Sequence, residues 1–230
     1  MKISIIIPTY NEEKTIGRLL QVIKNRSGKD EVREVIVCDG GSMDNTRSIA
    51  DKLGARVLIS TQKGRAAQMN HGAAVACGEV LHFIHADCVP PKEFTSLILK
   101  KLPPGTQAGC FMSKFDMGHW FLRLGNYLSF LPFWFCRGGG QTLWVTRELF
   151  HRVGGYDERM KLMEEYDLIA RLKKQTRFRV IRRFVIASAR DYRRNGALRL
   201  QFIYMKVFRM YAQGATQDEL LAYVKERVRK

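Results

Sequence analysis

Short apolar runs alternate with amphipathic segments over the first hundred residues. Ile3 to Ile7 is a β-branched run closed by Pro8, and the segment from Glu12 to Lys24 spaces its apolar side chains at helical intervals. The same alternation recurs, with strands predicted at 34–38, 56–59 and 80–84 and helices at 43–53, 65–77 and 92–101. Strands that are apolar on both faces and alternate with helices predict a mainly parallel α/β sheet flanked by helices.

The pattern becomes less regular after Pro103-Pro104-Gly105. Strands are predicted at 107–113, 141–145, 178–181 and 184–187, and an aromatic-rich segment that reaches Phe135 lies between the first two. Helices are predicted from Arg147, over 164–174, and near 198–212 and 218–229. With no internal repeat or low-complexity linker, residues 1–230 read as a single domain with a helical C-terminal extension.

Charge is unevenly distributed along the chain. The 26.5 kDa chain is 46% hydrophobic, which excludes disorder for most of its length, and its formal net charge is +17. Residues 171–230 hold 17 basic and 4 acidic side chains, a net +13. This excess predicts an anionic partner, which charge alone leaves open among nucleotide phosphates, nucleic acid and an acidic membrane surface.

The five cysteines and the N-terminus indicate a cytoplasmic protein. The cysteines are odd in number and lack CxxC spacing, so a disulfide scaffold and a zinc ribbon are both disfavoured. The apolar run at the N-terminus stops at Pro8, which is too short for a signal peptide. The most apolar later window, 119–136, contains Arg123, Asn126 and Pro132 and is no clean spanning helix.

Polar residues fall where predicted strands end, which is where parallel sheets bind ligands. Asp39 ends the second strand before Gly40-Gly41-Ser42, where its carboxylate can accept hydrogen bonds from a ribose or a base. The alternative is a turn and cap residue, because Asp, Gly and Ser favour turns. Taken alone, the sequence leaves both interpretations open.

His85-Ala86-Asp87 follows the predicted strand 80–84. If the strand continues, His85 and Asp87 share one direction and can hold a divalent cation against a diphosphate. An imidazole and a carboxylate are compatible with manganese, whereas magnesium prefers oxygen ligands. The alternative is a half-buried histidine beside a helix-capping aspartate.

Two further segments carry charges near predicted helix starts. Lys63 and Arg65 flank Gly64 before a small-residue helix, a place where backbone N–H groups and cations can cradle phosphate, although the spacing matches neither a Walker loop nor GxGxxG. Glu164 and Glu165 open the helix at 164–174, either as a charge-matched helix end or as a general base for an acceptor hydroxyl.

In this order the segments resemble the successive motifs of family 2 glycosyltransferases. The matching segments are IIIPTYNEE at 5–13, VCDGGSMDNT at 37–46, FIHAD at 83–87, GGYD at 154–157 and EE at 164–165. The resemblance covers residues 1 to about 175. The His-Ala-Asp form and the segment 64–70 are similar to a small bacterial branch described as radical-SAM or selenodomain-associated transferases.

The resemblance implies a GT-A fold, a nucleotide-sugar donor, with UDP-sugars favoured, and a divalent cation, Mn²⁺ or Mg²⁺. Within the single domain we expect a nucleotide-binding half at 1–104, an acceptor half at 105–190 and a basic helical extension at 191–230. The residues implied to bind the donor are Pro8, Thr9, Tyr10, Glu12, Asp39, Lys63, Arg65, Asn70 and Asp87. Asp87 and His85 are the implied metal ligands, and Glu165, or else its neighbour Glu164, is the implied general base of an inverting transfer.

Two residues depart from the family pattern: His85 replaces the usual first Asp of DxD, and Glu165 replaces the usual Asp.

Two other functions are weighed against the transferase. A nucleotidyltransferase usually has a basic, glycine-rich first loop, which 8–11 lacks, and a nucleic-acid-binding protein would leave the acidic motifs unexplained. The expected partners are therefore a nucleotide-sugar donor and an acceptor whose identity the sequence leaves open. No nucleic-acid partner is expected.

The basic C-terminal helices have two interpretations. Arg190, Arg193, Arg199 and Lys206 lie among apolar residues, a mixture that predicts peripheral contact with anionic lipid at the inner membrane face. The alternative is a helix whose apolar side closes the domain while its cations remain solvated.

Overall fold

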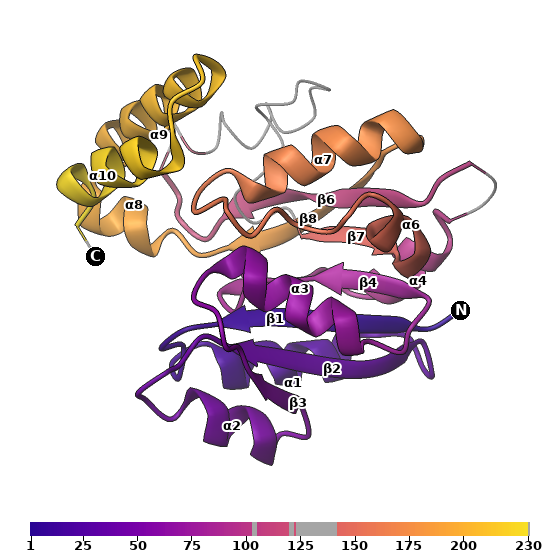
Figure 1. The fold of residues 1–230 in the computed structure, drawn as a ribbon. Coiled ribbons are helices and arrows are strands. Elements are labelled where there is room, and N and C mark those ends of the chain that lie inside the picture. Colours follow the sequence, from indigo (N-terminus) through magenta and orange to yellow (C-terminus); the bar gives the residue numbers. More distant parts are fainter. Residues whose placement is uncertain (103–104, 120–121, 123–141, 230) are drawn as a thin grey trace.

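The structure is a computed structural model that describes residues 1–102, 105–119, 122 and 142–229. In this part of the chain eight strands form one sheet in the order β3-β2-β1-β4-β7-β6-β8-β5 (Figure 1). The strands are β1 (Ile3–Thr9), β2 (Val32–Asp39), β3 (Arg56–Ile59), β4 (Val80–Phe83), β5 (Cys88–Val89), β6 (Ala108–Phe115), β7 (Leu143–Thr146) and β8 (Arg179–Ala187). The helices are α1 (Ile16–Arg26), α2 (Thr46–Lys52), α3 (Arg65–Val75), α4 (Phe94–Leu99), α6 (Arg147–Arg152), α7 (Glu164–Gln175), α8 (Arg190–Asn195), α9 (Ala197–Ala212) and α10 (Gln217–Arg227).

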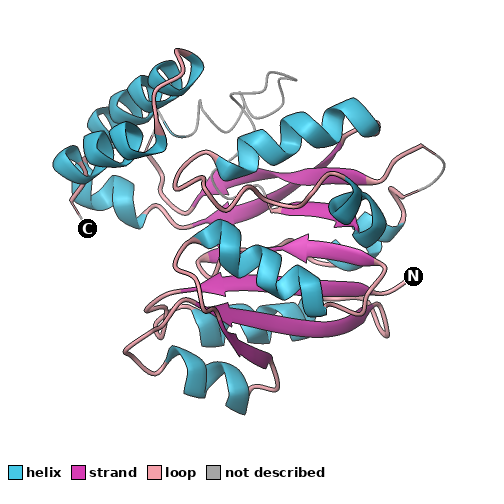
Figure 2. Ribbon diagram, in the orientation of Figure 1, coloured by secondary structure: helices cyan, strands magenta, loops and turns pink. Residues whose placement is uncertain are grey.

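The first half of the sheet is parallel, as predicted. β1 pairs in parallel with both β2 and β4, and β2 pairs in parallel with β3. The predicted elements of residues 1–101 are all present, with ends that differ by about one helical turn at most. Helices α1, α2 and α4 pack in a core on one face of the sheet, and α3, α6 and α7 pack on the other (Figure 2).

Helix α3 lies unusually close to the sheet because its inner face is made of small residues. A Cβ atom added to Gly72 would lie 2.6 Å from Cγ2 of Ile6 on β1 and 2.7 Å from Sγ of Cys38 on β2. Buried Ala66 and Ala73 continue this face along the helix. A glycine at position 72 therefore sets how near α3 approaches the strands that carry the candidate site.

The second half of the sheet is mixed, so the parallel prediction holds only for the first half. β7 is antiparallel to β4 and β6, β8 is parallel to β6, and β5 is antiparallel to β8. The two strands predicted at 178–181 and 184–187 are one strand. Its register shifts where Ile181 and Phe184 face consecutive residues of β6, so Arg182 and Arg183 form a bulge that interrupts the apolar pattern.

Helices α8, α9 and α10 form the predicted C-terminal extension and lie at the end of the sheet where β1 ends (Figure 1). The buried side of α9 carries Leu200, Ile203 and Val207. The ring of Phe208 on α9 contacts that of Tyr166 on α7 at a centroid distance of 4.8 Å. No helix among the described residues is long and apolar enough to cross a membrane. Most of the predicted aromatic segment up to Phe135 lies outside the described residues.

Candidate functional site

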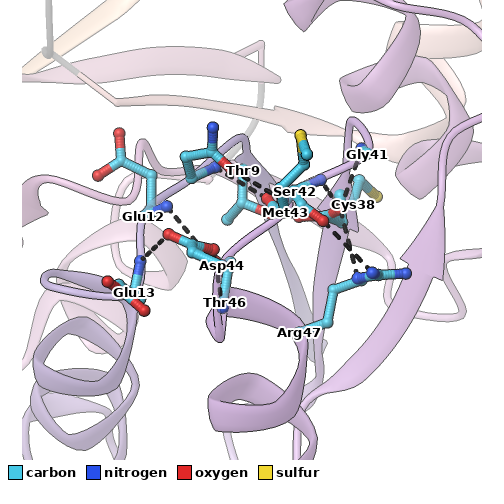
Figure 3. Close-up of polar contacts among 12 residues, drawn as sticks. Thr9, Glu12, Glu13, Cys38, Gly41, Ser42, Met43, Asp44, Thr46 and Arg47 are labelled. Atoms are coloured by element: carbon cyan, nitrogen blue, oxygen red, sulfur yellow. Dashed lines mark hydrogen bonds and ion pairs between the residues drawn. The ribbon is translucent and has the colours of Figure 1, made fainter.

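The loops that follow β1 and β2 are held together by hydrogen bonds (Figure 3). The backbone N–H of Asn11 donates to Oγ of Ser42 (2.8 Å), and the N–H of Met43 donates back to Oδ1 of Asn11 (2.9 Å). The N–H of Glu12 donates to Oγ1 of Thr46 (2.8 Å). Asn11 has a φ of 55°, a left-handed conformation that asparagine tolerates well. The polar residues of segments 5–13 and 37–46 therefore build a fixed platform at the carboxyl ends of β1 and β2.

Asp39 is the centre of this platform. Its side chain is fully buried, and its carboxylate accepts hydrogen bonds from Oγ1 of Thr9 (3.0 Å), the N–H of Gly41 (3.0 Å) and the N–H and hydroxyl of Ser42. Nε of Arg47 lies 3.9 Å from Oδ1 of Asp39. This geometry matches the turn-and-cap interpretation of Asp39. The expected contact with a base or ribose stays a prediction.

Gln68 is a residue that sequence reasoning missed. It lies on the buried face of α3 and donates from Nε2 to the carbonyl oxygens of Thr9 (2.7 Å) and Cys38 (2.8 Å). It thereby ties the ends of β1 and β2 together, where Pro8 and Thr9 are buried and Tyr10 is exposed. The available signal was one amide on an otherwise small and apolar helix face.

His85 contacts Glu165, the predicted general base. The distance between Nε2 of His85 and Oε1 of Glu165 is 2.6 Å, and both side chains are mostly buried. The prediction that His85 and Asp87 share one direction required the strand to continue, and this condition is not met. β4 ends at Phe83, and residues 85–88 form a turn in which the N–H of Cys88 donates to the carbonyl of His85. The imidazole is thus turned toward α7.

Arg65 and Glu164 form an ion pair between α3 and α7. Nε of Arg65 lies 2.5 Å from Oε1 of Glu164, whose side chain is almost fully buried and whose Oε2 has no hydrogen-bond partner among the residues that the structure describes. Burial alone would lower the pKa of Arg65, but the negative charges of Glu164 and Glu165 outweigh burial and raise that pKa above its ordinary value. Arg65 is therefore engaged with a carboxylate, and its predicted phosphate contact stays a prediction.

Asn70 fixes the GGYD motif. Its Nδ2 donates to the carbonyl of Tyr156 (2.8 Å), and its Oδ1 accepts from the N–H of the same residue (2.9 Å). Gly155 adopts a φ of 63° in this turn. The structure thus uses Asn70 to hold the loop before α7, while Lys63 is exposed in the loop before α3. Donor contacts of Asn70 and Lys63 stay predictions.

Arg190 of α8 brings together two of the predicted site residues. Its guanidinium donates to Glu12 from Nη2 (2.6 Å to Oε1) and from Nη1 (3.0 Å to Oε2). Nε of Arg190 lies 3.8 Å from Oδ2 of Asp87. The hydrogen bonds to Glu12, and then the charges of Glu12 and Asp87, raise the pKa of Arg190 above its ordinary value. Sequence reasoning missed this contact, because Glu12 and Arg190 lie 178 positions apart in the chain.

A cavity of about 620 Å³ opens beside Asp87. Its walls are the start of α1, strand β5 and the carboxyl ends of β6 and β8, and its charged lining residues are Lys14, Arg18, Asp87, Lys114 and Asp116. This volume is within the range of small-molecule sites. The edge of the sheet therefore offers room for a small ligand next to the acidic residues.

The described residues fit a divalent cation only in part. Among them no group of three His, Cys, Asp or Glu side chains could hold a metal ion. Asp87 offers a carboxylate at the edge of the sheet, whereas the His85 ring faces Glu165. Magnesium typically binds through one or two carboxylates plus substrate phosphates and water. Asp87 therefore fits a cation held largely by a substrate, and His85 as a ligand stays a prediction.

The half-parallel sheet, with its acidic edge and helices on both faces, defines a GT-A-type α/β protein. The chain belongs to glycosyl transferase family 2, whose sequence profile matches residues 4–156. It is 25% identical over 195 residues to the probable glycosyltransferase YdaM of Bacillus subtilis, covering 74% of this chain and 46% of that protein. It is 31% identical over 97 residues to a glucosyl-3-phosphoglycerate synthase of Mycolicibacterium smegmatis, covering 39% and 32%. The chain thus spans less than half the length of these curated relatives.

Solved structures share the fold. The mannosyltransferase PcManGT from Pyrobaculum calidifontis, in complex with GDP-Man and Mn²⁺, superposes with a TM-score of 0.68 at 20% identity, covering 90% of this chain and 62% of that one. TarS 1-349 of S. aureus, in complex with UDP-GlcNAc, gives 0.67 at 20% identity, covering 82% and 58%. At these identities the likeness shows the GT-A fold.

Proposed function

We propose that this chain is an inverting glycosyltransferase that moves a sugar from a nucleoside-diphosphate sugar to an acceptor hydroxyl. The observation that carries the proposal is the juxtaposition of His85 with Glu165, on a family 2 scaffold whose Asp87 lies two residues further along the same turn. A single displacement needs a general base near the acceptor hydroxyl and positive charge near the leaving diphosphate, which Glu165 and a cation held by Asp87 would supply.

In this mechanism Glu165 accepts the proton of the acceptor hydroxyl. The acceptor oxygen then forms a bond to the anomeric carbon, while the bond from that carbon to the diphosphate breaks and its electron pair leaves with the nucleoside diphosphate. Asp87 would hold a divalent cation, Mn²⁺ or Mg²⁺, and the cation would supply positive charge next to the departing diphosphate. His85 orients the carboxylate of Glu165 by the 2.6 Å contact.

The nucleoside moiety is proposed to bind over the platform formed by the β1 and β2 loops. Pro8, Thr9, Tyr10, Glu12 and Asp39 all lie at this edge, and Tyr10 is exposed there. The complexes of PcManGT with GDP-Man and Mn²⁺ and of TarS with UDP-GlcNAc support the donor class and the cation. They leave both GDP- and UDP-sugars as candidates, with UDP-sugars favoured by the sequence resemblance.

The experiment is a panel of UDP-, GDP- and dTDP-sugars, each with Mn²⁺, Mg²⁺ or chelator, read out as the shift in melting temperature. We expect one nucleotide class to stabilise the protein and the divalent cation to enlarge the shift. NMR of the transferred sugar then gives the anomeric configuration of the product. A product with retained configuration rejects the single displacement, and the absence of any stabilising donor rejects the nucleotide-sugar substrate class.

Family membership favours this function over the two alternatives. The matched region, 4–156, includes the acidic motifs around Asp39 and Asp87, which a nucleic-acid-binding protein would leave unused. A nucleotidyltransferase would be supported instead by release of pyrophosphate from a nucleoside triphosphate and a sugar phosphate. The finer resemblance to the small bacterial transferase branch stays a prediction.

Peripheral membrane contact is proposed from the outer side of α9. The inner apolar stripe of this helix closes the domain, but Leu198, Phe202 and Met205 form a second stripe at helical spacing whose side chains are exposed, Phe202 by 68%. Exposed Arg199, Lys206 and Arg209 lie on the same helix. Exposed apolar residues bordered by cations suit the interface of an anionic lipid bilayer.

Sedimentation with vesicles tests this contact. We expect binding that rises with the fraction of acidic lipid, falls with salt, and weakens in Phe202→Ser. The matched control is Met43→Ser, since Met43 is 92% exposed on the β2 loop, far from α9 in the sequence. Equal binding of both variants, or none to acidic vesicles at low salt, would contradict the membrane role.

A further inference from the structure

The guanidinium of Arg190 contacts Glu12 and lies close to Asp87, two residues of the candidate donor site. It forks onto both carboxylate oxygens of Glu12 and faces Asp87 at 3.8 Å. Glu12 also accepts a hydrogen bond from Oγ1 of Thr15 at 2.7 Å. Arg190 begins α8, directly after β8 and the short connection 188–189, so the paired strand fixes where its side chain starts.

Exposure distinguishes the three side chains. Arg190 is 45% exposed, whereas Glu12 is 12% and Asp87 is 23% exposed. A cation that solvent and ligands can reach therefore covers two carboxylates that are mostly shielded. Without it, both carboxylates would be left without this counter-charge at the place where an anionic diphosphate is proposed to bind, an arrangement that Coulomb repulsion disfavours.

We propose that Arg190 is a donor-binding residue that exchanges partners when the donor arrives; this inference rests on the proposed function. In the free protein the guanidinium neutralises Glu12 and Asp87. When the donor binds, Asp87 turns to the divalent cation and Arg190 turns its planar fork to the diphosphate, a group whose oxygens match it in bidentate geometry.

This exchange makes cation and diphosphate binding cooperative. A divalent cation alone has to compete with the guanidinium for Asp87, so it binds weakly. A diphosphate that draws Arg190 away frees Asp87 for the cation, and by linkage the cation strengthens diphosphate binding by the same factor. Arg190 thus has opposite effects on the two ligands, which a purely structural residue would not have.

The test titrates Mn²⁺ alone and inorganic pyrophosphate alone into the wild-type chain and Arg190→Gln by calorimetry. Loss of the positive charge is expected to tighten Mn²⁺ binding several-fold and to weaken pyrophosphate binding about 10-fold, the scale of one charge-assisted hydrogen bond. Arg190→Lys keeps the charge but loses the fork, so it is expected to keep Mn²⁺ binding weak and to bind pyrophosphate with intermediate affinity. This second variant also decides the question if Arg190→Gln does not fold.

The matched control is Arg193→Gln. Arg193 lies on the same helix and pairs with Asp116 at 2.9 Å, so the variant makes the same change in charge and also breaks an ion pair. Its affinities for both ligands are expected to equal the wild type. The inference is overturned if Arg190→Gln leaves both affinities unchanged, or lowers both, or if Arg193→Gln reproduces its effects. Failure of the wild-type chain to bind any nucleotide sugar would instead overturn the proposed function.

Discussion

Asp39 and Asp87 are two carboxylates at the same edge of one sheet, and their surroundings are opposite. Asp39 is fully buried and accepts hydrogen bonds from three residues of its own and the adjacent loop. Asp87 is partly exposed and faces a guanidinium that comes from a helix over a hundred residues later. The polar groups of the β1 and β2 loops are thus satisfied by one another. The charged residues Glu12, Asp87 and Arg190 instead make partly exposed contacts that a ligand can replace.

The largest effect that would separate the two regions is on stability. Asp39→Ala is expected to lower the free energy of unfolding by about 3 kcal/mol, because it strands several buried donors. Asp87→Ala is expected to cost less than about 1 kcal/mol, since its partner is half exposed, but to abolish metal-dependent donor binding. Urea denaturation measures the first quantity and donor titration with Mn²⁺ the second. A stable Asp39→Ala that no longer binds nucleotide would give Asp39 a ligand-binding role instead.

A second comparison concerns the adjacent carboxylates of α7. Glu165→Gln is expected to keep donor binding and to lower turnover by about 100-fold, the scale of a lost general base. Glu164→Gln is expected to act on stability, because it removes the charge that pairs with Arg65 at 2.5 Å. Steady-state kinetics and thermal melts of both variants give the answer. If Glu164→Gln is the variant that loses turnover while remaining stable, the general base is Glu164 and not Glu165.

The third prediction concerns His82, a buried imidazole on β4. His82 is fully buried between the rings of Phe94 (5.4 Å) and Phe111 (5.9 Å), and burial lowers its pKa from 6.5 to about 3. As the pH falls, His82 is therefore protonated in the unfolded chain before it is protonated in the folded chain. The contribution of His82 to stability is complete above pH 6.5 and is lost as the pH falls toward 3. Between pH 7 and pH 5 this loss amounts to about 2 kcal/mol.

His82→Phe is expected to remove this part of the acid sensitivity. Its free energy of unfolding should fall by about 2 kcal/mol less between pH 7 and pH 5 than that of the wild type. His151→Gln is the control, since His151 is exposed on α6. Urea denaturation at the two pH values measures the difference, and equal acid sensitivity of wild type and His82→Phe would contradict a neutral buried imidazole.

The sequence predicted what depends on local pattern. The alternation of apolar runs and amphipathic segments gave the strands and helices of the first half and placed Asp39 and Asp87 at strand ends. It missed β5, because two residues are too short for a pattern, and it divided β8 in two because the bulge at Arg182-Arg183 breaks the alternation.

Pairings between distant segments were beyond the sequence. Arg65 was predicted to bind phosphate and lies on Glu164, which is 99 residues away. Asn70 was predicted to bind the donor and holds the Tyr156 backbone, which is 86 residues away. Arg190 was predicted only as part of a basic extension. In each case residue type and local spacing indicated which kind of group the side chain could bind. The residue that it actually contacts depends on how the sheet and its helices pack together.

The position of Arg190 directly after β8 also has a consequence for how the protein is made. The ribosome synthesises Glu12 and then Asp87 early, and reaches Arg190 only after every strand of the sheet has been translated. The guanidinium that balances these two acids is therefore among the last parts of the site to exist. Until Arg190 has been translated, Glu12 and Asp87 have no guanidinium to pair with, so this contact can form only after the strands of the described sheet have been synthesised.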